Sequence, residues 1–120
     1  MYSERLLDHF QSPRNAGELP GASVTVRQEN PVCGDVLELS AVIREGVVEA
    51  IRFRAKGCVP AIACASAMCE LAQGKTLSWV AEISKGDVLA AVGGVPAASD
   101  HAAQLAVDAV RALLVGVKNK

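Results

Sequence analysis

The spacing of apolar residues changes along the chain and divides it into a β-rich part and a helical part. Alternation of apolar and polar residues predicts three strands, over residues 23–28, 35–43 and 47–55. The last two strands are separated by residues 44–46, Arg-Glu-Gly, which favour a hairpin turn. Ile51 and Phe53 alternate with arginines, so we expect one face of the sheet to contact solvent.

Helical patterns flank this β-rich part. A short helix is predicted over residues 3–11, and helical segments follow the strands over residues 60–74, 76–83, 86–94 and 99–116. Ser3 and Thr76 are suited to cap the helices that follow them. The last segment carries one apolar stripe, formed by Leu105, Ala106, Val110, Leu113 and Leu114. We therefore predict an α+β fold: a single domain over residues 1–120, with a small three-stranded antiparallel sheet packed on one face by helices.

Charge and hydropathy exclude several classes of function. The formal net charge is −1, without the basic surplus expected for binding to nucleic acid or an anionic membrane. No apolar run approaches the roughly 20 residues needed to span a bilayer. The first residues also lack the apolar core of a secretory signal, so we predict a cytoplasmic protein with reduced thiols. In that compartment, metal binding, reactivity or burial explains a cysteine better than a disulfide does.

Three of the four cysteines lie close together in sequence, yet their spacing does not allow two of them to hold one ion. On a helix, Cys64 and Cys69 differ by roughly 140° around the axis. We interpret both as small buried residues among alanines. Cys58 instead stands at a strand-to-helix junction, where the helix N-terminus favours a thiolate. Burial of Cys58 at the junction is the alternative.

Two further segments carry candidate ligands. Cys33 and Asp35 lie on one tight turn, where a thiol and a carboxylate can meet at a cation; alternatively, Asp35 caps local N–H groups. His101 falls in the first turn of the last helix, whereas we interpret His9 as a surface or packing residue. We predict one site that combines Cys58 with Cys33, Asp35 and His101.

A cap is also expected at the start of the last helix, since Ser99 and Asp100 both precede His101. Either side chain can accept a hydrogen bond there.

Four stretches resemble the IscU/NifU N-terminal type of iron–sulfur cluster assembly scaffold: YSERLLDHFQSPRNAG, PVCGD, FRAKGCVPAIACAS and DHAAQLAVDAV. The resemblance covers essentially the whole chain, and it implies an IscU/SufE-like fold. It also implies a scaffold that receives sulfur from a cysteine desulfurase, assembles a [2Fe–2S] cluster and passes it to apo acceptor proteins. The family's ligands match Cys33, Asp35, Cys58 and His101.

The chain departs from the family pattern at two places. The family's third cysteine, directly after the histidine, is replaced by Ala102. The chaperone-recognition segment, Leu-Pro-Pro-Val-Lys in the family, reads VPAAS over residues 95–99 and lacks the lysine, so we do not expect a standard handoff through an Hsp70-type chaperone. The insertion typical of SufU-like, zinc-dependent sulfurtransferases is also missing.

Three hypotheses follow, none of them an enzyme with its own turnover. The first is a scaffold or carrier of iron or a labile [2Fe–2S] cluster, since mixed cysteine and histidine ligation of such clusters is chemically sound. The second is a zinc-bound sulfur carrier that works with a cysteine desulfurase, and the third is a degenerate regulatory paralogue without cluster chemistry. After purification in air we expect zinc, if any metal, on Cys33, Cys58, His101 and Asp35, with water or Asp100 as a substitute for Asp35.

Overall fold

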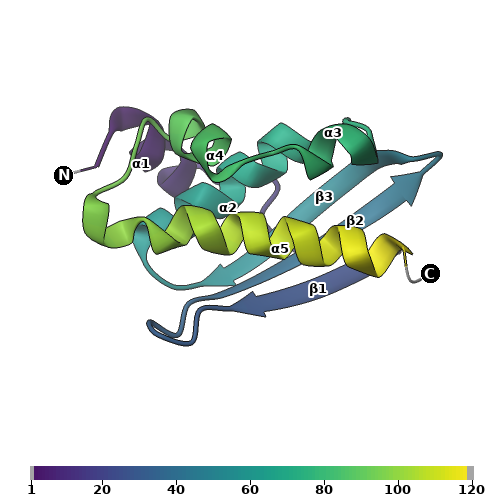
Figure 1. Cartoon of the computed structure of the whole chain (residues 1–120), viewed down its shortest axis with the longest axis horizontal. Helices are drawn as coiled ribbons and strands as arrows, with labels where there is room; N and C mark the ends of the chain where they lie inside the picture. The colour runs from purple at the N-terminus through teal and green to yellow at the C-terminus, as the bar shows by residue number, and fades with distance from the viewer. Residues whose placement is uncertain (1, 119–120) are drawn as a thin grey trace.

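The computed structural model describes residues 2–118, and its elements follow the predicted order. They are α1 (Glu4–Gln11), β1 (Val24–Glu29), β2 (Val36–Arg44), β3 (Val47–Lys56), α2 (Val59–Ala72), α3 (Leu77–Ala81), α4 (Lys85–Ala91), a short 3-10 helix (Ala97–Ser99) and α5 (His101–Lys118). The three strands form one antiparallel sheet in the order β1-β2-β3 (Figure 1). The predicted α+β class is therefore confirmed.

The alternation within β3 gives the sheet one buried and one exposed face. Ile51 and Phe53 are buried in the core, while Arg52 and Arg54 between and after them are exposed. The β2–β3 hairpin closes at Glu45 and Gly46, with φ angles of 53° and 75°. These left-handed angles suit the right-handed twist of a tight hairpin and favour glycine at the second position.

Helices α2 and α5 cover the buried face of the sheet, α2 against β3 and α5 against β1 and β2 (Figure 1). α2 is buried almost all round because α1, α4 and α5 also pack against it. The small alanines of α2 allow its neighbours to approach closely. Cys64 and Cys69 lie among these alanines and have the packing role that was expected for them. Both cysteines are fully buried.

Side-chain caps set several helix starts, and one expected cap is replaced by a different contact. Ser3 and Thr76 accept hydrogen bonds from backbone N–H groups as predicted. At the last helix, Ser99 ends the 3-10 turn and α5 begins at His101. Asp100 has a helical backbone, and its carboxylate pairs with Lys85 of α4 instead of turning back to cap α5.

Three connections lie together at one end of the molecule: the β1–β2 turn, the β3–α2 corner and the start of α5 (Figure 1). The candidate ligands lie on these three connections.

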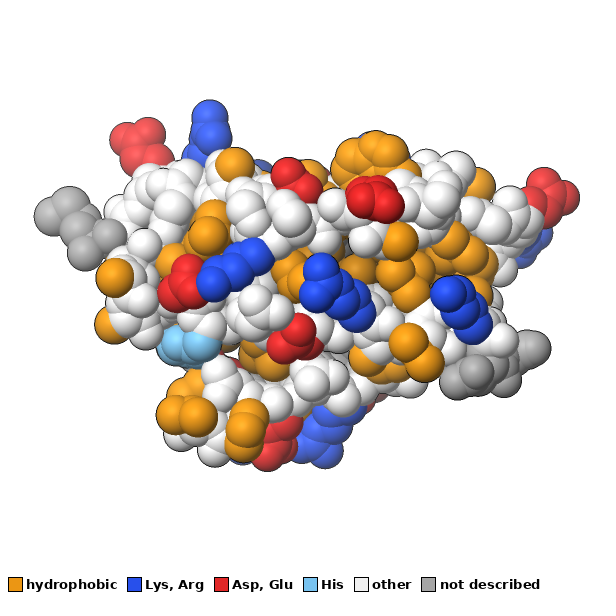
Figure 2. Space-filling model, viewed as in Figure 1, with side chains coloured by type: hydrophobic (Ala, Val, Ile, Leu, Met, Phe, Trp, Pro, Cys, Tyr) orange, Lys and Arg blue, Asp and Glu red, His pale blue; other side chains and the backbone are white. Residues whose placement is uncertain are grey.

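Among the described residues, no helix has both the length and the apolar character needed to cross a membrane. On the face shown in Figure 2, acidic and basic side chains are interspersed.

Candidate metal centre

Three of the four predicted ligands come together in the folded chain. Cys33, Asp35 and His101 each offer one donor atom, and these atoms lie within 4.8 Å of one another. Cys33 and Asp35 come from the β1–β2 turn, and His101 opens α5. Donor atoms that each lie about 2.0–2.3 Å from one ion are somewhat less than 4.8 Å apart. A small inward movement of these three side chains would therefore suffice for them to bind one metal ion.

Asp35 links the fourth predicted ligand to this group. The Cys58 thiol donates a hydrogen bond to Asp35 Oδ2 over 3.4 Å, and His101 Nε2 lies 3.6 Å from the same oxygen. Asp35 is only 6% exposed, whereas both Cys33 and Cys58 are exposed. The carboxylate thus lies between two ligands in a sheltered position, and the two thiols remain accessible to a partner.

The sequence predicts that the helix N-terminus favours a Cys58 thiolate, but the surroundings of Cys58 favour the protonated thiol. Cys58 is the N-cap of α2, as its place before Pro60 suggests, but the pKa of its thiol is raised. Partial burial of the sulfur raises this pKa most, and the Asp35 carboxylate adds to the effect, while a hydrogen bond from the Ala61 backbone opposes it. In the metal-free protein, desolvation outweighs the helix N-terminus, and the thiol is the favoured form.

The turn that carries Cys33 is held by Asn30, a residue that the sequence analysis did not single out. Its side-chain Oδ1 accepts a hydrogen bond from the Val32 N–H over 2.9 Å, and its backbone bonds to Gly34 and Asp35. Gly34 has a φ of 78°, as expected for a glycine in such a turn. Asn30 therefore performs the local capping, and the Asp35 carboxylate is left to face Cys58 and His101. The Asn-Pro dipeptide was the available signal.

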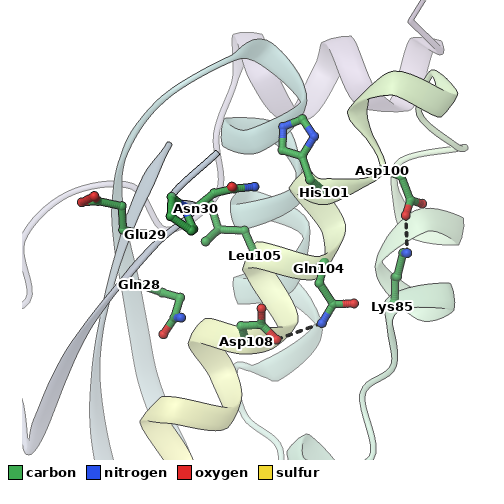
Figure 3. Close-up of a pocket in the computed structure, with 10 residues that line it drawn as sticks. Gln28, Glu29, Asn30, Lys85, Asp100, His101, Gln104, Leu105 and Asp108 are labelled. Atoms are coloured by element: carbon green, nitrogen blue, oxygen red, sulfur yellow. Dashed lines mark hydrogen bonds and ion pairs between the residues drawn. The ribbon is translucent and has the colours of Figure 1, made fainter. Parts of the chain in front are cut away.

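A pocket of about 440 Å³ adjoins the site, between the end of β1 and the first turns of α5 (Figure 3). The Asp100 carboxylate points to Lys85 of α4, away from His101. Asp100 therefore already has a cationic partner in this structure, and its entry as a substitute for Asp35 stays a prediction. Lys85, absent from the sequence analysis, fixes the start of α5 from the neighbouring helix.

The residues left out of the predicted site lie elsewhere. Burial raises the pKa of Cys64 to about 12 and raises the pKa of Cys69 still further, so both thiols stay protonated in the core. His9 is 5% exposed and packs between α1 and α2, with Nδ1 2.8 Å from Ser66 Oγ. Ala102, next to His101, is buried and offers no donor atom.

Comparisons with known proteins agree with this architecture. The family described as "NifU-like N terminal domain" matches residues 1–120. The iron-sulfur cluster assembly scaffold protein IscU 1 of Archaeoglobus fulgidus is 39% identical over 115 residues, which cover 96% of this chain and 75% of the relative. The IscU scaffold protein of Escherichia coli K12 is 34% identical over 123 residues, covering 99% of this chain and 95% of that one. The crystal structure of a nitrogen-fixing NifU-like protein (N-terminal) from Brucella abortus superposes with a TM-score of 0.80 at 18% identity, over 98% of this chain and 94% of the other.

Proposed function

We propose that this chain, which belongs to the NifU-like N terminal domain family, is a scaffold on which iron–sulfur clusters are assembled and from which they pass to acceptor proteins. The cargo is iron or a labile [2Fe–2S] cluster, held by Cys33, Asp35, Cys58 and His101. One observation carries the proposal: donors from the β1–β2 turn and from the start of α5, far apart in sequence, lie within 4.8 Å of one another.

The chemistry of the donor set suits a cargo that must leave again. Two thiolates, one imidazole and one carboxylate make four ligands, and mixed cysteine and histidine ligation of a [2Fe–2S] cluster has precedent in Rieske centres. Iron bound to a carboxylate in place of a third thiolate is held less firmly, because soft thiolates are the preferred ligands of such clusters. The exposed thiols of Cys33 and Cys58 allow an acceptor to approach the cargo directly.

The partners follow from the same chemistry. Assembly needs a source of sulfur, for which a cysteine desulfurase in the cytoplasm is the proposed donor, and it needs apo acceptor proteins. We do not include a chaperone of the Hsp70 type, because residues 95–99 lack the lysine of the recognition segment. The whole of residues 1–120 acts in this proposal as one domain without an enzymatic activity of its own.

Anaerobic reconstitution tests the proposal. The protein is incubated with ferrous iron, sulfide and reductant, desalted and examined for sulfide-to-iron charge-transfer absorption. We expect a coloured, oxygen-sensitive product in the wild type and its loss in Cys33→Ala and Cys58→Ala. Cys69→Ala is the matched control, because it removes a fully buried thiol from the far part of α2 and should leave the colour unchanged. A wild-type protein that stays colourless contradicts the proposal.

A second function, a zinc-bound sulfur carrier, is favoured by one observation. Cys33 is exposed on a tight turn beside Val32, which is 94% exposed, so a desulfurase could reach this thiol without unfolding the protein. Zinc can bind these four ligands, two thiolates, one imidazole and one carboxylate, in a tetrahedral arrangement. The test is whether the protein stimulates desulfurase turnover and acquires a persulfide on Cys33 or Cys58. Stimulation without a reconstituted cluster would favour the carrier over the scaffold.

A further inference from the structure

We infer that Gly57 is a positioning residue for Asp35: the missing side chain at this position makes the space in which the Asp35 carboxylate lies between Cys58 and His101. The inference rests on the proposed function, since it concerns the same ligand set, but it makes a geometric claim that is testable without metal. Gly57 directly follows β3 at the corner between β3 and α2, and Asp35 lies on the neighbouring β1–β2 connection.

The distances leave no room for any other residue at this position. A Cβ atom built on Gly57 would lie 2.6 Å from Asp35 Oδ1 and 2.7 Å from Asp35 Cγ, well inside van der Waals contact. It would also approach Asp35 Cβ to 3.1 Å. The carboxylate therefore packs directly on the backbone of Gly57, which explains how a charged group that is 6% exposed fits between a strand and a helix corner.

The glycine is explained by the space that it leaves, and not by a left-handed backbone. Gly34 and Gly46 have φ angles of 78° and 75°, in the left-handed region that disfavours a side chain. Gly57 does not have such a positive φ. The main change in Gly57→Ala is therefore the loss of the space occupied by Asp35.

The expected response of the structure is a movement of the Asp35 side chain. The nearest atoms are Oδ1 and Cγ of the Asp35 side chain, and not backbone atoms. Rotation about the Asp35 Cα–Cβ bond would carry the carboxylate away from the new methyl group. The 3.1 Å contact with Asp35 Cβ, an atom that this rotation does not move, would be relieved by a small shift of the backbone. Oδ2 would then lose the thiol of Cys58 and the ring of His101, which lie 3.4 Å and 3.6 Å from it.

The first arm of the test is metal-free and concerns geometry. A crystal structure of the Gly57→Ala variant should retain the fold and show the Asp35 carboxylate outside hydrogen-bond distance of the Cys58 sulfur. Gly86→Ala is the matched control, since a Cβ there would lie 3.6 Å from Ser84 Oγ, an ordinary contact. An Asp35 carboxylate that keeps its place in Gly57→Ala overturns the inference.

The second arm measures the affinity for Co²⁺ by direct titration. Gly57→Ala should weaken Co²⁺ binding by about tenfold or more, because loss of the contacts that orient a metal ligand typically costs this much affinity. Gly86→Ala should bind Co²⁺ like the wild type. In an Asp35→Ala background, Gly57→Ala should have no further effect on affinity. Equal losses with and without the carboxylate would overturn the positioning role. A wild type that takes up no Co²⁺ would instead count against the proposed function, and the metal-free structure would still decide on Gly57.

Discussion

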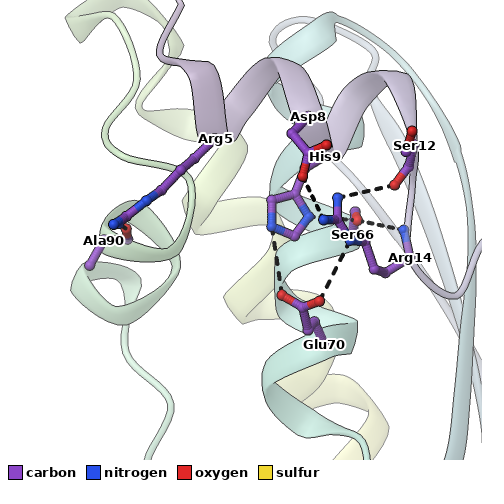
Figure 4. Close-up of polar contacts among 8 residues, drawn as sticks. All are labelled: Arg5, Asp8, His9, Ser12, Arg14, Ser66, Glu70 and Ala90. Atoms are coloured by element: carbon purple, nitrogen blue, oxygen red, sulfur yellow. Dashed lines mark hydrogen bonds and ion pairs between the residues drawn. The ribbon is translucent and has the colours of Figure 1, made fainter.

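Two histidines with neighbouring carboxylates lie in this molecule, and their surroundings differ in one decisive respect. His9 is enclosed between α1 and α2, and its ring contacts Ser66 at 2.8 Å and Glu70 at 3.8 Å (Figure 4). His101 is the first residue of α5, 3.6 Å from Asp35 and within 4.8 Å of the exposed Cys33 thiol. The first cluster satisfies its members from within, whereas the second groups a sheltered carboxylate with thiols that are open to solvent. The same residue types thus serve packing in one place and, in the proposed function, binding in the other.

The enclosed cluster joins two helices through a fully buried serine. Ser66 Oγ accepts a hydrogen bond from the Arg14 backbone N–H over 2.8 Å, and it also pairs with His9 Nδ1. The Arg14 side chain reaches Asp8 and Glu70 at the surface (Figure 4). Burial lowers the pKa of His9 more than the nearby carboxylates raise it, and the Arg14 charge lowers it further. His9 is therefore neutral near pH 7, as suits a structural contact and not a ligand site open to solvent.

The largest expected effect breaks the enclosed cluster. Ser66→Ala leaves the Arg14 N–H and the His9 ring nitrogen without their partner in a buried place, and each such group costs about 1–3 kcal/mol. We expect a loss of about 3 kcal/mol in the free energy of unfolding, measured by urea denaturation, with unchanged Co²⁺ affinity.

The matched control is Ser40→Ala, on the exposed face of the sheet, where Ser40 Oγ pairs with Thr25 at 3.0 Å. There water replaces the lost partner, so the change should stay within about 0.5 kcal/mol. A similar loss in both variants would mean that the buried cluster does not stabilise the α1–α2 contact.

The next effect concerns the open cluster. His101→Ala removes a ligand from an exposed site, so Co²⁺ affinity should fall by about tenfold to a hundredfold, or about 1.4–2.7 kcal/mol of binding free energy. The metal-free variant should unfold like the wild type, because no enclosed contact is lost. Isothermal titration with Co²⁺ and urea denaturation of the same sample separate the two quantities. Reduced stability with intact affinity would reverse the roles assigned to the two histidines.

The smallest effect is a pH dependence of stability that belongs to His9. Since its folded pKa lies below the unfolded value of about 6.5, the unfolded chain takes up a proton that the folded chain rejects. Stability contributed by neutral His9 is therefore present above about pH 6.5 and is lost progressively as the pH falls below it.

The variant His9→Gln removes this titration. Its free energy of unfolding, measured by urea denaturation from about pH 7.5 to about pH 5.5, should fall less steeply than that of the wild type. Parallel curves for the two proteins would show that His9 does not couple protonation to folding.

Most of the fold could be predicted from local patterns of apolar residues and helix caps, because these patterns agree with the strands and helices that form. Alternation fixed which face of β3 is buried, and Ile51 and Phe53 lie in the core as expected. The predicted caps Ser3 and Thr76 also form, since each depends only on residues three positions apart. The expected side-chain cap of α5 is replaced by an ion pair, because the Asp100 carboxylate binds Lys85, a partner 15 positions away.

The candidate site was predictable as a set of residue types, but not as a geometry. The positions of Cys33, Asp35, Cys58 and His101 followed from turns and helix starts, while the order of contacts around Asp35 depends on how three connections pack. The raised pKa of Cys58 likewise comes from burial, which local sequence does not report. The role inferred for Gly57 was hidden for a similar reason: the space it leaves is filled by a residue 22 positions earlier.

The most direct test of the ligand set is X-ray absorption at the zinc edge of protein loaded with zinc. Zinc reports its own neighbours, with sulfur at about 2.3 Å and nitrogen or oxygen at about 2.0–2.1 Å. We predict two sulfur and two lighter ligands, one of them an imidazole, with one sulfur lost in either Cys33→Ala or Cys58→Ala. A shell without sulfur, or one that both cysteine variants leave unchanged, would contradict this prediction.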